Sequence, residues 1–63
     1  MNKYLIVLKD KNNKEFLNEY DIQNIEIYMG VIVIAYMLES TAKELETHSN
    51  IESIEKMEQS MSI

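Results

Sequence analysis

An unbroken apolar run, Val31 to Leu38, constrains the fold of this 63-residue chain more than any other feature. It is rich in β-branched side chains and follows Gly30, the only glycine, which is typical of a strand after a tight hairpin or a bulge. The run is far shorter than the roughly 20 residues that a membrane-spanning helix needs. A chain this small buries only about 60% of the surface that its unfolded form exposes. We therefore expect one face of the strand to lack cover from the chain itself.

Shorter periodic segments flank the run. Alternating apolar residues predict strands before and after it, and Phe16, Leu17 and Tyr20 recur at helical spacing. Thr41 and Glu44 have the spacing of a capping box, which indicates the start of a second helix. We expect strands at residues 3–9, 22–29, 31–38 and 51–57, and helices at residues 13–20 and 40–50.

The predicted order is βαββαβ. Short connections and right-handed crossovers favour an α+β fold of the ferredoxin-like, open-faced sandwich type, with a four-stranded antiparallel sheet and two helices on one face. The first and third strands, which are the most apolar, then lie in the middle of the sheet. Residues 1–57 form the domain, and residues 58–63 have no periodicity and are expected to be an extended C-terminal tail.

Either alternating half of the apolar run leaves an apolar open face. One half is Val31, Val33, Ala35 and Met37, and the other, which we take as the candidate interface, is Ile32, Ile34, Tyr36 and Leu38. Together with residues of the neighbouring strand, an apolar patch of this kind is usually covered by another protein. Periodicity leaves two occupants open, a second copy of the chain or a different protein that meets the sheet with its own helices.

Composition excludes several classes of function. The 11 acidic and 6 basic residues give a net charge of −5, which argues against a nucleic-acid surface. There is no cysteine, and His48 is the only histidine, so neither a disulfide nor a metal site is expected. We find no catalytic constellation and no glycine-rich phosphate loop, so we expect neither an enzyme nor a cofactor. The first residues lack a signal-peptide pattern, and we expect the chain to be made in the cytoplasm.

Three segments carry a resemblance to a known family. They are an opening strand, Tyr4-Leu-Ile-Val-Leu-Lys9, a late helix that contains Ala42-Lys-Glu-Leu45, and a last strand, Ile51-Glu-Ser-Ile-Glu-Lys56. With the order of elements, the chain resembles the propeptide, or prodomain, of subtilisin-family serine proteases over nearly its whole length. Among such prodomains, its sequence most resembles the short prodomains of clostridial spore-germination proteases of the Csp type.

The resemblance implies a partner and a set of contacts. A subtilisin-like protease domain from the same precursor would be the partner, and the prodomain would act as its folding chaperone and, after autoprocessing, as its inhibitor. The sheet would pack on two protease helices, with Glu55 capping their N-termini. The family's second acidic position falls on Met57, and the adjacent Glu58 is the candidate substitute.

The tail has a separate implied role. Its last residues would lie in the protease cleft as the product of the first cut, namely Ser60, Met61, Ser62 and Ile63. Many subtilisins prefer a large apolar residue at the fourth place from the cut, where this chain has Ser60. The resemblance also implies an association with spores. The alternative from the residues alone is a free-standing ferredoxin-like module that forms a homodimer through its open sheet face.

Overall fold

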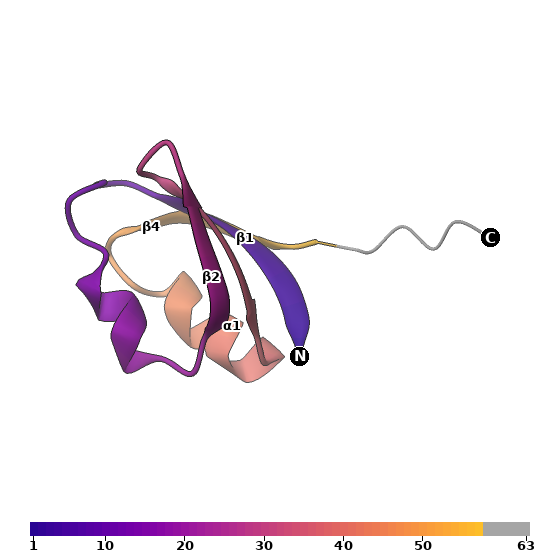
Figure 1. Ribbon diagram of the computed structural model, residues 1–63. Helices are drawn as coiled ribbons and strands as arrows, with labels where there is room; N and C mark the ends of the chain where they lie inside the picture. The colour runs from indigo at the N-terminus through magenta and orange to yellow at the C-terminus, as the bar shows by residue number, and fades with distance from the viewer. Residues whose placement is uncertain (58–63) are drawn as a thin grey trace.

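The computed structural model describes residues 1–57 of the chain (Figure 1). One sheet, one α-helix and one five-residue 3-10 helix make up this part, and the sheet lies on one side of both helical segments. In chain order the elements are β1 (Asn2–Leu8), η1 (Glu15–Glu19), β2 (Gln23–Tyr28), β3 (Ile32–Met37), α1 (Glu39–Glu46) and β4 (Ile51–Lys56).

The sheet has four strands in the order β2-β3-β1-β4, and every neighbouring pair is antiparallel. The predicted α+β class and the four-stranded antiparallel sheet are therefore confirmed, as is the central position of the two most apolar strands. The physical reason is burial, because a central strand is flanked on both edges and tolerates polar side chains least. Both connections that cross the sheet, through η1 and through α1, run over the same face.

The first predicted helix does not form as an α-helix. In its place is η1, whose i to i+3 hydrogen bond joins the Leu17 amide to the Lys14 carbonyl at 3.0 Å. Lys14 at the N-cap makes no side-chain cap, and only Phe16 and Leu17 are buried. Five residues with no side-chain cap at the N-terminus and only two adjacent anchors are too few to propagate as an α-helix.

A single hydrophobic cluster holds the sheet to the helical layer. Ile6, Val33, Met37 and Leu45 are its largest fully buried side chains. Alternation in β1 and β3 points every second residue into this cluster, where it meets the buried side chains of both helical segments. The remaining buried members are Tyr4, Leu8, Phe16, Leu17, Ala35, Ala42 and Ile51.

Asn50 joins two distant segments of the chain. It is the buried polar residue of the described part, with only 5% of its surface exposed. Its side-chain Oδ1 accepts a hydrogen bond from the Asp10 amide at 2.8 Å, and its Nδ2 donates to the carbonyls of Asp10 and Asn13 at 3.1 and 2.7 Å. The side chain therefore fixes the loop after β1 against the start of β4.

His48 packs beside this clamp. Its ring stacks on Phe16 with centroids 3.9 Å apart and an interplanar angle of 10°. Its Nδ1 accepts a hydrogen bond from the Asn50 amide at 3.0 Å, which places the ring proton of the neutral form on Nε2. The contact between His48 and Phe16 ties the turn after α1 to η1.

Candidate functional site: the sheet face without helices

Alternate residues of β3 point away from the core. Val33, Ala35 and Met37 are buried beneath the helical segments, whereas Ile32, Ile34 and Tyr36 are half-buried on the opposite side of the sheet. No helix of residues 1–57 covers that side (Figure 1). We call it the open face.

Strand β1 extends the apolar row across the open face. Leu5 lies opposite Ile34, and Val7 lies opposite Ile32, so the four aliphatic side chains share one face of the two central strands. Each remains half-buried because its neighbours shield it laterally, although nothing in the described chain lies over it. This is a contiguous apolar surface in the middle of the sheet.

Leu38, which the sequence placed in the same row, lies elsewhere. Strand β3 ends at Met37, and Leu38 is the N-cap residue of α1. Its carbonyl accepts a hydrogen bond from the Ala42 amide at 3.0 Å, and 48% of the residue is exposed. The sequence shows no break here because Leu38 continues the apolar run, although leucine is disfavoured at the N-cap of a helix.

Acidic groups flank the apolar row on both sides. Glu55 of β4 lies opposite Leu5 and is exposed on the open face. Glu26 and Tyr28 of β2 lie opposite Ile34 and Ile32 on the other side of the row. The open face therefore has an apolar centre with carboxylates at two edges.

The two β2 side chains form a polar pair. The Tyr28 hydroxyl donates a hydrogen bond to Glu26 Oε1 at 2.8 Å. This hydrogen bond and, to a smaller extent, the negative charge of Glu26 raise the pKa of Tyr28 above its ordinary value of 10.0. Residues two apart in a strand lie on the same face, which is why this pair can form.

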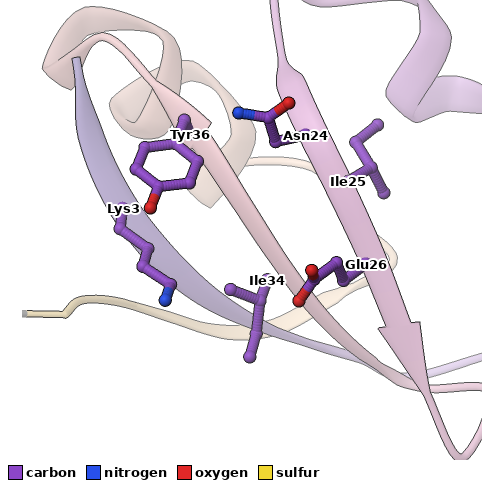
Figure 2. Close-up of a pocket in the computed structure, with 6 residues that line it drawn as sticks. All are labelled: Lys3, Asn24, Ile25, Glu26, Ile34 and Tyr36. Carbon is purple, nitrogen blue, oxygen red and sulfur yellow. The ribbon is translucent and has the colours of Figure 1, made fainter.

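A hollow of about 340 Å³ lies between β2 and the central strands (Figure 2). It forms where the pairing of β2 with β3 shifts between Gln23 and Glu26, with Asn24 in the left-handed region at φ 55°. Figure 2 shows Asn24 and Glu26 directed toward β3, with Ile25 on the other side of the strand. The lining residues are Lys3, Asn24, Ile25, Glu26, Ile34 and Tyr36.

Lys3 gives this hollow its positive charge. Its Nζ lies 6.0 Å from the centroid of the Tyr36 ring, at the outer limit of a cation–π contact. The hollow thus combines an ammonium group, an amide, a carboxylate and an aliphatic floor. Such a lining suits a polar side chain of a docked protein. Lys3, Asn24 and Glu26 were not predicted as site residues from the sequence. The only sequence feature that could have indicated the hollow is the break in apolar–polar alternation at the start of β2.

The other predicted contacts are placed in part. Met57 is half-buried, and its amide donates to the Lys3 carbonyl at 2.8 Å. Glu58, the candidate substitute for Met57 at the second acidic position, lies outside the described residues, as do the predicted tail residues Ser60, Met61, Ser62 and Ile63.

Other kinds of site are not seen in the described part of the chain. Residues 1–57 contain no group of three or more His, Asp or Glu side chains placed to hold a metal ion. Within the same residues, no helix has the length and apolar character to cross a bilayer.

Comparisons with protein-family models, curated proteins and solved structures found no match to this chain.

Proposed function

We propose that this chain is the cleaved prodomain of a subtilisin-like serine protease, which it helps to fold and then inhibits. The observation that supports this proposal is the open face, where an apolar row on β1 and β3 lies next to an exposed carboxylate, Glu55, on β4. The resemblance of the sequence to such prodomains supplies the identity of the partner. The chain itself is not the enzyme under this proposal.

The strand order supports the same proposal at the level of the fold. The order β2-β3-β1-β4 is that of a ferredoxin-like sandwich, and η1 takes the place of the first helix. A 3-10 helix of five residues is sufficient there because Phe16 and Leu17 are the two buried side chains that it contributes to the core. Under this proposal, α1 and the five-residue η1 would stand in for the two helices of the family.

Docking would bury the apolar row under two helices of the protease. Leu5, Ile32 and Ile34 are already half-buried, so their remaining surface can be covered without moving the sheet. Burying a side chain of this size fully is worth about 1.5–3 kcal/mol relative to full exposure, and a half-buried one proportionally less. The hollow beside Lys3 would receive a polar side chain of the docked protein.

Glu55 would fix the orientation of the docked protease helices on the open face. A carboxylate at a helix N-terminus accepts hydrogen bonds from amides that lack partners and interacts with the positive end of the helix dipole, worth about 0.3–2 kcal/mol. Glu55 is exposed on the open face beside Leu5, where a docked helix could present its N-terminus. Glu58 remains the candidate for a second cap.

Inhibition would come from residues 60–63, which would occupy the substrate cleft of the protease. Chaperone activity would come from binding that is coupled to folding of the protease. An extended segment pairs its backbone with the edges of the cleft, and alternate side chains enter the subsites. A module that binds only the native protease stabilises that form by mass action, which favours folding.

The test is binding of the full chain to a catalytically dead subtilisin-like protease, measured by calorimetry. We expect Ile34→Gln to weaken binding roughly tenfold, because it removes apolar surface from the centre of the open face. Leu38→Gln is the matched control, since Leu38 is apolar and exposed but lies off the sheet, and it should bind as the natural chain does. Equal loss in both variants, or no binding of the natural chain, would overturn the proposal.

The same surface supports a second candidate, a module that forms a homodimer through the open face. Sedimentation of the isolated chain separates the two. The homodimer is favoured if the natural chain forms a stable dimer that does not bind the dead protease, and if Ile34→Gln dissociates that dimer.

A further inference from the structure

The outer edge of β2 is the least protected part of the sheet. The strand is at one end of the sheet order, and no strand of residues 1–57 pairs with its outer side. All six of its residues are exposed, including Ile25 and Ile27 at 38% and 46%. The opposite edge, β4, carries the charged side chains Glu52, Glu55 and Lys56, which discourage pairing with another strand.

The backbone of β2 shows which groups are available at that edge. The Leu8 amide donates to the Val31 carbonyl at 2.8 Å, so Val31 and every second residue after it direct their backbone groups toward β1. Ile32 and Ile34, which alternate with them, direct theirs toward Tyr28 and Glu26 of β2. Ile27 lies between these two residues and therefore directs its N–H and C=O outward, away from the sheet.

We propose that this edge pairs antiparallel with β2 of a second copy of the chain, with Ile27 opposite Ile27 of the second copy. In this register the two Ile27 residues exchange both backbone hydrogen bonds across a two-fold axis. The pairing joins the two sheets into one continuous sheet and leaves both open faces on the same side.

The side chains favour this register over its neighbours. Glu26 comes to lie opposite Tyr28 of the second copy, which repeats between chains the carboxylate–hydroxyl pair that forms within one chain at 2.8 Å. A register centred on Glu26 would place two carboxylates directly opposite each other, which is destabilising.

Directed cross-linking tests the register. The natural chain has no cysteine, so single variants Glu26→Cys and Tyr28→Cys give unambiguous products. Residues 26 and 28 of opposing strands form a pair without backbone hydrogen bonds, with Cα atoms about 4.5 Å apart, which a disulfide can span. We expect mild oxidation of the mixed variants to give the mixed disulfide dimer, and each variant alone to cross-link far less. Equal cross-linking of each variant alone, or none in the mixture, would overturn the proposal.

Sedimentation equilibrium of the full chain tests the edge itself. Ile27→Pro removes the outward amide and leaves the ladder with β3 intact, so we expect dimerisation to weaken roughly tenfold. Lys56→Pro at the opposite edge is the matched control and should dimerise as the natural chain does, with circular dichroism verifying that both variants fold. A monomer at every concentration, or a dimer lost in Ile34→Gln but not in Ile27→Pro, would overturn the proposal. No protease is present in either experiment, so the outcome is independent of the proposed function.

Discussion

At the scale of single residues, polar side chains with several defined partners decide local structure. Asn50 uses both ends of its amide, and no buried side-chain nitrogen or oxygen of residues 1–57 lacks a hydrogen-bond partner. Such an arrangement is stable only as a whole, because a buried group that loses its partner keeps the full penalty of its desolvation.

We expect Asn50→Ala to lower the free energy of unfolding by about 2–4 kcal/mol, because it leaves the Asp10 amide and the carbonyls of Asp10 and Asn13 without their partner. Urea denaturation followed by circular dichroism measures the change. Asn12→Ala is the matched control, since the Asn12 side chain is exposed and only its backbone amide is bonded, to Asp10 Oδ1. The control should stay within about 0.5 kcal/mol. An equal effect in both variants would contradict the assigned role.

The Tyr28–Glu26 pair predicts a dependence on alkaline pH. Because the pKa of Tyr28 is raised in the folded chain, the protonated hydroxyl is favoured there. Its contribution to stability is present below the unfolded pKa and is lost as the pH rises through the higher folded pKa.

Absorbance titration of tyrosinate isolates this group, when the curve of Tyr28→Phe is subtracted from that of the natural chain. We expect Glu26→Gln to move the Tyr28 pKa part of the way back toward 10.0, since it removes the charge but retains a hydrogen-bond acceptor. An unchanged titration would show that the pair does not persist in solution.

At the scale of elements, the hairpin between β2 and β3 sets which face each residue of β3 occupies. Met29 and Gly30 both have positive φ, 55° and 78°, in the turn that brings Tyr28 opposite Ile32. Glycine adopts such values without strain, whereas methionine does not. The sequence prediction of a turn at Gly30 is confirmed, and its neighbour is the strained residue.

We expect Met29→Asn to raise the free energy of unfolding by about 0.5–1 kcal/mol, because asparagine tolerates the left-handed region and Met29 is 89% exposed with little packing to lose. Gly30→Ala should instead destabilise by about 1 kcal/mol or more, since its new Cβ would lie 3.3 Å from Lys11 Cβ at a positive φ. Thermal melts of both variants provide the measurement. Destabilisation by Met29→Asn would contradict this account of the turn.

At the scale of the whole molecule, the core and the proposed binding surfaces use opposite sides of one sheet. The buried members of the hydrophobic cluster all lie between Tyr4 and Ile51 in the sequence. The open face is on the opposite side of the sheet from this cluster. Folding and binding are therefore separable, because each uses a different half of the alternating side chains.

The chain truncated after Met57 is expected to keep its fold, because every member of the cluster is retained. Under the proposed function it should still bind the dead protease through the open face but should no longer inhibit the active enzyme. Circular dichroism and a peptide-hydrolysis assay measure the two properties. Full inhibition by the truncated chain would exclude a role for residues 60–63 in the cleft.

The sequence alone determined the order of elements and the strands that lie in the centre of the sheet, because apolar content follows burial. It also determined that one face of the sheet would be apolar, since both halves of the run from Val31 to Leu38 are apolar. The sequence did not determine which half of this run is buried. Alternation of apolar and polar residues indicates the buried face of a strand, and here every residue is apolar.

Only the tertiary structure decided that Val33, Ala35 and Met37 are buried and that Leu38 lies at the start of α1. It likewise decided that the first helix is a short 3-10 helix and that Asn50 bonds to a loop about 40 residues away in sequence. These outcomes depend on contacts between segments far apart in the chain. Local patterns of residues do not encode them, since register, helix length and buried hydrogen bonds are settled by what packs against each segment.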